Sequence, residues 1–190
     1  VDIQRTRDGM LVLSHDEDLQ RVYGVRANIR ESLWEDLRKI EKDGYRLASL
    51  EEALELTKGR VGMLLEIKNP EDALAVLDLL ERKKVADWTA LISFYPQALE
   101  KVKGKVATGL LYSNPPGMIP EAKKLGCSFV LPKYMLATQK AVDFAHRLKL
   151  KVIAWTVNDL EKAKELFQRG VDGIATDNVE LLRKGLYLNV

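Results

Sequence analysis

The sequence is poor in cysteine and in long apolar runs. Cys127 is the single cysteine among 190 residues, so no disulfide can form within the chain. This usage is typical of a reducing compartment, and we expect a cytoplasmic protein. Cys127 precedes an apolar run, and we interpret it as a buried bystander rather than a nucleophile. No apolar stretch approaches the roughly 20 residues that a membrane-spanning helix needs, so no span is predicted.

An excess of charge of one sign is also absent. The chain has 30 Lys and Arg against 28 Asp and Glu, and the two signs are interleaved along it. A nucleic-acid groove is therefore not indicated, and we expect no nucleic-acid partner. Gly/Ser-rich and Pro-rich linkers are lacking, while 46% of the residues are hydrophobic, enough to bury a core. We predict one domain over residues 1–190.

Apolar β-type runs alternate with amphipathic helical stretches. The expected strands share a β-type apolar composition and lie at 1–4, 61–67, 90–94, 106–111, 128–131, 151–156 and 172–176. A repeated order of strand, short loop and helix is typical of parallel βαβ units. The pattern predicts an α/β fold, which is either a TIM-type (β/α)8 barrel or an open doubly wound sheet.

Polar residues at the expected carboxyl ends of the strands favour the barrel. In a barrel these ends meet at one mouth, whereas an open sheet gathers its ligand groups at one switch point. The residues are Asp2, Glu66, Ser93, Trp155 and Thr176. A full barrel has eight strands, and about seven can be counted. We therefore expect that the first βα unit is missing ahead of Val1.

The segment after the first strand departs from this rhythm. Residues 10–14 are expected to form a hairpin with the first strand, because Asp8 and Gly9 supply suitable turn chemistry. We predict a small insertion at about 18–50. Within it, the apolar spacing over 32–42 predicts an amphipathic helix.

One imidazole, two carboxylates and one ammonium group lie in or just after predicted strands. Asp2 belongs to the first strand, His15 follows the hairpin, and Glu66 and Lys68 end the strand at 61–67. Carboxylates in this arrangement suit a hard divalent cation, and histidine suits proton transfer near neutral pH. The set predicts metal-assisted chemistry on a phosphate ester.

Each of these residues has an expected role and a structural alternative. Asp2 and Glu66 are expected to hold Mg²⁺ or Ca²⁺, with Mn²⁺ as a further candidate, and so to neutralise phosphodiester charge. Lys68 shares a strand face with Glu66 and is expected to contact the phosphate. His15 is expected to protonate the departing alkoxide. Alternatively, Glu66 and Lys68 form a structural ion pair, and His15 is a hydrogen-bonded turn residue.

The stretch 1–21 combines Asp2, a Thr-x-Asp-Gly turn, His15-Asp16 and Arg21. This combination is similar to the second motif of the glycerophosphodiester phosphodiesterase family, and the resemblance continues in the same order over nearly the whole chain. Four further segments resemble family motifs: Glu-Ile-Lys at 66–68, Ser-Phe at 93–94, Trp-Thr-Val-Asn at 155–158 and Asp-Gly-Ile-x-Thr-Asp at 172–177.

The resemblance implies a TIM-type barrel and a function. The implied reaction is metal-dependent hydrolysis of small-molecule glycerophosphodiesters to glycerol 3-phosphate and an alcohol. A glycerol hydroxyl would act as the internal nucleophile, and water would open the resulting cyclic phosphate. The resemblance also implies that Ser93 and Trp155 contact the substrate, Trp155 as an apolar wall against the glycerol carbons.

The chain departs from the family at its start. The family begins with a His-Arg-Gly strand and a Glu-Asn-Thr helix start, and both motifs are absent here. We expect that this segment was lost or left out, in which case the enzyme interpretation stands. One alternative is a non-catalytic barrel that has lost its first motif. The other is a different barrel enzyme of phosphorylated metabolites, although Gly170 and Gly173 alone do not supply the phosphate loop it needs.

Overall fold

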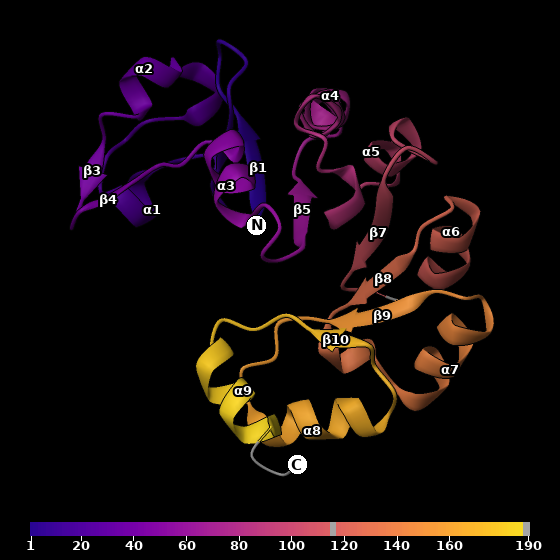
Figure 1. Cartoon of the computed structure of the whole chain (residues 1–190). Coiled ribbons are helices and arrows are strands. Elements are labelled where there is room, and N and C mark those ends of the chain that lie inside the picture. The colour runs from indigo at the N-terminus through magenta and orange to yellow at the C-terminus, as the bar shows by residue number, and fades with distance from the viewer. Residues whose placement is uncertain (115–116, 188–190) are drawn as a thin grey trace. The chain divides into compact units, whose positions relative to one another are not determined.

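The computed structural model describes residues 1–114 and 117–187 (Figure 1). The chain divides into two compact units, Val1–Ala107 and the residues from Thr108 onward. Within the described residues, no helix is both long and apolar enough to cross a bilayer. The predicted single domain with an insertion at about 18–50 stays a prediction.

The first unit contains an antiparallel hairpin, a region of short elements and parallel strands joined by helices. Its strand order is β6-β5-β1-β2, in which β1, β5 and β6 are parallel and β2 is antiparallel to β1. The elements are β1 (Asp2–Arg5), β2 (Leu11–Leu13), α1 (Gln20–Tyr23), α2 (Trp34–Leu37), β3 (Glu41–Lys42), β4 (Tyr45–Arg46), α3 (Leu50–Thr57), β5 (Met63–Ile67), α4 (Ala73–Lys83), β6 (Thr89–Ser93) and α5 (Pro96–Lys101). Short 3-10 helices cover Ile29–Glu31, Pro70–Asp72 and Ala86–Trp88.

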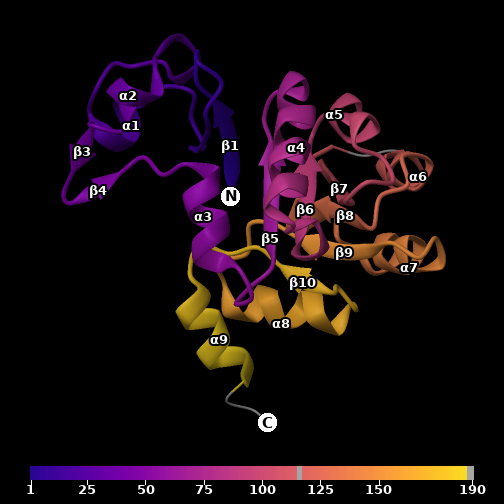
Figure 2. The same ribbon diagram turned by 45° about the horizontal axis from the view of Figure 1, so that its top comes forward.

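The main core of the first unit lies between its strands and the helices α3, α4 and α5. Figure 2 shows α4 alongside β5, and buried side chains of both elements belong to one cluster. On β5, Leu65 and Ile67 are buried in this cluster. Because side chains alternate along a strand, Glu66 points to the opposite face of the sheet. The same alternation separates Asp2 from the buried Ile3 on β1.

The predicted hairpin is confirmed, and the predicted helix over 32–42 is wrong. β1 and β2 pair in antiparallel register around a turn in which Gly9 has a φ of 91°. The helix α2 is only four residues long, and Glu41–Lys42 instead pair with Tyr45–Arg46. Asp43 and Gly44 between them both have positive φ, as a tight two-residue hairpin turn requires. Local turn chemistry therefore overrides the helical apolar spacing.

A smaller core supports these short elements. Its buried members come from β2, the residue before α1, the 3-10 helix at Ile29–Glu31, α2 and the segment after β4: Val12, Leu19, Ile29, Leu37 and Leu47. These contacts join the end of the hairpin strand β2 to the segment that follows it. The position of α1 is therefore fixed by apolar packing rather than by its own four residues.

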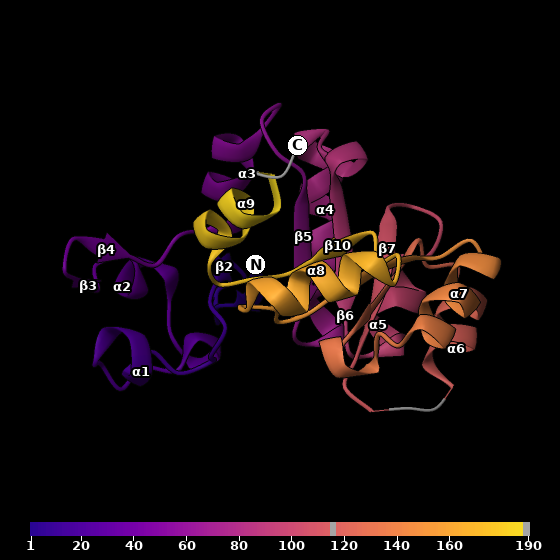
Figure 3. The same ribbon diagram turned by 90° about the horizontal axis from the view of Figure 1, so that it is seen from below.

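The second unit is a regular series of parallel strands and helices. Its strand order is β7-β8-β9-β10, with all strands parallel, and helices α6 and α7 lie side by side (Figure 3). The elements are β7 (Ala107–Tyr112), α6 (Met118–Lys124), β8 (Phe129–Pro132), α7 (Gln139–Arg147), β9 (Lys151–Ala154), α8 (Leu160–Gln168), β10 (Gly173–Ile174) and α9 (Val179–Tyr187), with a 3-10 helix at Tyr134–Leu136. The alternation predicted for this part of the chain is confirmed.

Candidate active site

Asp2 and Glu66 lie side by side on neighbouring parallel strands. β1 pairs with β5 so that Asp2 stands opposite Glu66 and Ile3 opposite Ile67. Asp2 is the first residue of β1, not its carboxyl end as expected. β1 continues beyond the end of β5 into the hairpin with β2, so its first residue is level with the carboxyl end of β5. The sheet register therefore brings the two carboxylates together.

The ammonium group of Lys68 lies between these carboxylates. Its Nζ is 2.9 Å from Asp2 Oδ1 and 3.1 Å from Glu66 Oε1. The three side chains are partly exposed, Glu66 at 16%, Lys68 at 23% and Asp2 at 25%. With all three ionised, the cluster carries a formal charge of −1. The structure thus unites three of the predicted site residues in one accessible charged cluster.

The electrostatic balance of the cluster keeps Lys68 protonated. Burial acts to lower the pKa of Lys68, but hydrogen bonds and charge from Asp2 and Glu66 outweigh it and raise that pKa. Burial raises the pKa of Glu66, the charge of Asp2 adds to the rise, and Lys68 opposes it. A cation near Glu66 therefore favours its ionised form.

The donor set agrees in part with the predicted divalent cation. Carboxylate oxygens are the ligands that Mg²⁺ and Ca²⁺ prefer. Among residues 1–114 and 117–187, no three His, Cys, Asp or Glu side chains converge as a complete metal site. Mg²⁺ is commonly held by one or two carboxylates, with water and substrate phosphate as its other ligands. The pair of Asp2 and Glu66 fits that mode of binding.

His15 follows β2 at the base of the hairpin. The backbone N–H of its neighbour Ser14 donates to the carbonyl of Asp2 at 3.0 Å. The His15 side chain is 67% exposed, and its Nδ1 lies 2.7 Å from Asp16 Oδ1. Asp16 Oδ2 accepts a hydrogen bond of 2.5 Å from Arg21 Nε. The hairpin thus returns an exposed imidazole to the strand that carries Asp2.

Ser93, a predicted substrate contact, is fully buried at the end of β6. Its hydroxyl donates to the carbonyl of Ile67 at 2.8 Å and accepts from the N–H of Tyr95 at 3.1 Å. These bonds join the ends of β5 and β6 and occupy the donor of the hydroxyl and one of its two acceptor lone pairs. A role in substrate binding stays a prediction for Ser93.

Trp155 belongs to the second unit, where it follows β9 and is partly exposed. Its indole Nε1–H donates to the carbonyl of Leu131 at 2.7 Å, and its backbone carbonyl accepts from Tyr134 at 2.8 Å. The ring is therefore held in a fixed orientation at the carboxyl end of its strand. Its contact with substrate stays a prediction.

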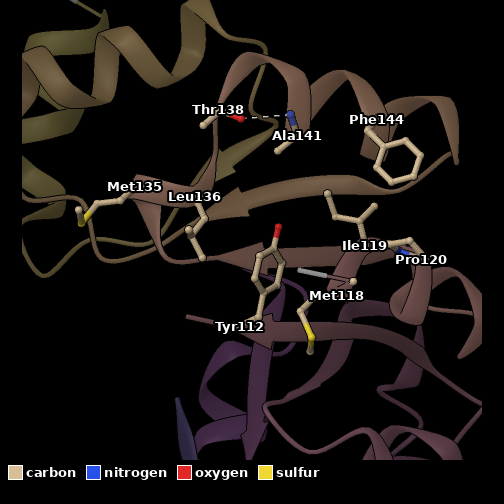
Figure 4. A pocket seen from close by; sticks show the side chains of 10 residues that line it. Tyr112, Met118, Ile119, Pro120, Met135, Leu136, Thr138, Ala141 and Phe144 are labelled. Atoms are coloured by element: carbon tan, nitrogen blue, oxygen red, sulfur yellow. Dashed lines mark hydrogen bonds between the residues drawn. The ribbon is translucent and has the colours of Figure 1, made fainter. Parts of the chain in front are cut away.

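The second unit also has an apolar pocket of about 360 Å³ (Figure 4). The hydroxyl of Tyr112 points into it, and burial raises the pKa of this group to about 12. Apolar walls come from Ile119 of α6, Leu136 of the 3-10 helix and Phe144 of α7. Among the described residues, no charged side chain lines the pocket. The pocket therefore lacks the groups that a phosphodiester needs, and the charged cluster in the first unit remains the candidate active site.

One buried charge in the first unit was not predicted. Asp72, with a side chain 3% exposed, contacts the Arg30 guanidinium and lies 3.8 Å from Arg5 Nη1. The Nε of Arg5 is buried without a hydrogen-bond partner among the residues that the structure describes. No sequence spacing links these three residues, because their contacts are set by the tertiary structure.

Asp16 and Arg21 were part of the predicted motif but received no role. Asp16 could have been noticed because it directly follows His15, and Arg21 because it is a basic residue five positions after Asp16. Their hydrogen bonds show that the three side chains form a chain from imidazole to carboxylate to guanidinium.

Comparison with known proteins places the chain in a family. The family model described as the glycerophosphoryl diester phosphodiesterase family matches residues 1–181. A glycerophosphodiester phosphodiesterase of Caldanaerobacter subterraneus subsp. tengcongensis is 27% identical over 97% of this chain and 85% of its own length.

Solved structures show the same fold. A glycerophosphodiester phosphodiesterase from Parabacteroides distasonis is 25% identical, with a TM-score of 0.85, and the match covers 99% of this chain and 82% of that one. A phosphodiesterase from Oleispira antarctica, solved in complex with the product sn-glycerol-3-phosphate, is 21% identical, with a TM-score of 0.89 over 97% of this chain and 83% of that one.

These similarities confirm the α/β fold of TIM-barrel type and the enzyme class, a phosphodiesterase of glycerophosphodiesters. These comparisons concern the chain and its fold, and they do not test the roles of individual site residues. By the match over most of its length, the chain belongs to the glycerophosphoryl diester phosphodiesterase family.

Proposed function

We propose that the chain releases glycerol 3-phosphate and an alcohol from glycerophosphodiesters, in a reaction that depends on a divalent cation. The observation that carries the proposal is the Lys68 ammonium group between the carboxylates of Asp2 and Glu66. Such an arrangement holds charged groups at an accessible strand end, where an anionic phosphate can reach them. The product bound to the Oleispira antarctica relative supports the choice of glycerol 3-phosphate.

Asp2 and Glu66 would hold the cation, Mg²⁺ or Ca²⁺, with Mn²⁺ as a further candidate. When bound, such an ion neutralises phosphoryl charge and polarises the reacting oxygens. The cluster of Asp2, Glu66 and Lys68 has a formal charge of −1, which repels an anionic diester. A bound divalent cation would make the local charge positive and remove this repulsion. Family membership and the hard donor set support the proposal.

Four further side chains have proposed roles in the reaction, three from the first unit and Trp155 from the second. Lys68 adds a fixed positive charge for a phosphoryl oxygen, and its raised pKa keeps that charge at neutral pH. His15, whose Nδ1 faces Asp16, has its Nε2 for proton transfer to the departing alkoxide. Trp155 would form an apolar wall against the glycerol carbons, and Ser93 would contact the substrate. The cytoplasmic location stays a prediction that the single cysteine supports.

Turnover of glycerophosphocholine tests the proposal, measured as glycerol 3-phosphate released with and without EDTA. We expect activity that EDTA abolishes and that Mg²⁺ or Ca²⁺ restores. Lys68→Met should lower kcat/KM by about 10²–10³-fold, the usual cost of one charge-stabilising group in a transition state.

Lys83→Met is the matched control. Lys83 also lies between two carboxylates, those of Glu51 and Glu55, and its side chain is 24% exposed against 23% for Lys68. It should keep wild-type activity. Absence of turnover by the wild-type chain, turnover indifferent to EDTA, or equal losses in both variants would overturn the proposal.

A further inference from the structure

We propose that Asp16, held in place by Arg21, is a positioning residue that fixes the tautomer and the orientation of the His15 imidazole during hydrolysis. This inference rests on the proposed function, in which His15 transfers a proton. It assigns roles to two residues that lie outside the cluster of Asp2, Glu66 and Lys68.

The geometry defines which nitrogen of His15 carries a proton. Nδ1 lies 2.7 Å from Asp16 Oδ1, a hydrogen-bond distance. Hydrogen bonds from Arg21 and from His15 hold the pKa of Asp16 at about 2, so the carboxyl is ionised and can only accept. Nδ1 must therefore donate, which leaves Nε2 as the nitrogen that gains and loses a proton.

Asp16 is itself fixed from two sides. Arg21 Nε donates to its second carboxylate oxygen at 2.5 Å, and Ser14 Oγ donates to its backbone carbonyl at 2.6 Å. Arg21 lies in α1, which Leu19 anchors to the small core of the first unit. Among the described residues, Asp16 is the ionisable group in contact with the imidazole, and Arg21 acts on it through Asp16. The short elements after the hairpin thus support the orientation of His15.

The second histidine of the chain shows how a structural pair differs. His146 contacts Asp172 through Nε2 at 2.9 Å, and Asp172 also accepts from the backbone N–H of Val152 at 2.7 Å. Its carboxylate is thus shared with the main chain rather than with an arginine. In the His15 pair the bond is made through Nδ1, and the partner carboxylate is held by a side chain that α1 supplies.

The two supporting residues should move the pH profile in opposite directions. The Asp16 carboxylate is a negative charge beside the imidazole, so its removal in Asp16→Asn should shift the basic limb of kcat to lower pH. Arg21 offsets part of the Asp16 charge, so Arg21→Gln should shift the same limb to higher pH, by about half a unit. Purely structural roles would not produce opposite shifts.

The experiment measures kcat and KM for glycerophosphocholine against pH at saturating Mg²⁺. Asp16→Asn should lower kcat at pH 7.5 by about 10–100-fold with KM changed less than twofold, because the acid group is misoriented rather than the substrate site lost. Asp16→Glu should recover part of kcat. Asp172→Asn, at the structural pair, should leave both parameters unchanged.

The outcomes separate this inference from the proposed function. If wild type is inactive, or if His15→Asn is as active as wild type, His15 does not transfer the proton. The positioning role of Asp16 is then contradicted as well. If His15→Asn is inactive while Asp16→Asn keeps the wild-type kcat and pH profile, the positioning role is wrong and the hydrolase remains. Should Asp16→Asn fail to fold, Arg21→Gln decides: an unshifted limb, or one shifted to lower pH, overturns the inference.

Discussion

The two units of the chain use charged residues in different ways. In the first unit, the partly exposed side chains of Asp2, Glu66 and Lys68 meet on one face of the sheet, and two of the three carry the same charge. In the second unit, Glu165 pairs with Lys162 and Arg169 along α8 and its end, away from the strand ends, whereas Tyr112 and Trp155 stand at the carboxyl ends of its strands. The charged residues with a proposed role in the reaction therefore lie in the first unit, and the second unit contributes Trp155 as a predicted substrate contact.

The two units also differ in their histidine–aspartate pairs, His15–Asp16 in the first and His146–Asp172 in the second. His15 and Asp16 are adjacent in sequence and exposed, so their bond closes no loop of the chain. His146 and Asp172 are 26 residues apart, and their bond connects α7 to the segment before β10. An interaction between sequence neighbours adds little to the fold, whereas one between distant segments supports tertiary structure.

The largest expected difference is in activity, between His15→Asn and His146→Asn. His15→Asn should lower kcat by about 10²–10⁴-fold, the typical contribution of a general acid, and leave the free energy of unfolding nearly unchanged. His146→Asn should keep kcat and lose less than about 1 kcal/mol of stability, as is usual for partly exposed ion pairs. Steady-state kinetics and urea unfolding of both variants test this. Equal kinetic losses would contradict the division of roles.

The site could be predicted where its geometry depends on strand alternation. Lys68 follows Glu66 by two residues, so a shared face was expected, and the ammonium indeed contacts that carboxylate. The proximity of Asp2 to Glu66 was also expected, but for a partly wrong reason. Asp2 begins its strand, and only the register between β1 and β5 brings it opposite Glu66.

Other features depend on contacts that periodicity does not encode. The helix expected over 32–42 stops at Leu37, because Asp43 and Gly44 form a hairpin turn and commit the residues on either side to strands. Asp72 is a second example. Its partner Arg30 is 42 residues away, and a carboxylate in the first turn of a helical stretch is an ordinary sequence feature.

A smaller difference should separate Asp72→Ala from Asp78→Ala, two acids six residues apart. Asp72 is buried against Arg30, and its removal takes away the closest carboxylate of a partly buried guanidinium, leaving only Glu17 at 4.0 Å among the described ion pairs of Arg30. We expect a loss of about 3 kcal/mol in the free energy of unfolding. Asp78 pairs with Arg82 on the surface, where its side chain is 65% exposed, and its loss should cost less than about 0.5 kcal/mol. Urea unfolding followed by circular dichroism measures both, and similar values would show that Asp72 is solvated.

The smallest expected effect is a pH dependence of stability in the second unit. Burial alone would raise the pKa of Asp172, but the N–H of Val152 and the imidazole of His146 outweigh it and hold the pKa below its ordinary value of 3.8. A depressed pKa means that Asp172 stabilises the folded state when ionised, above pH 3.8, and that this contribution is lost as the pH falls below that value.

Asp172→Asn removes this titration but keeps an oxygen that can accept from Val152. The variant should therefore be less stable than wild type at pH 5 by less than about 1 kcal/mol, since the side chain is 34% exposed, and the gap should close as the pH falls from 4 to 2.5. Asp143→Asn, which alters a carboxylate that accepts from Gln139 within α7, is the control and should show no such convergence. A gap that stays constant or widens between pH 5 and pH 2.5 would contradict a stabilising role for the ionised Asp172 carboxylate.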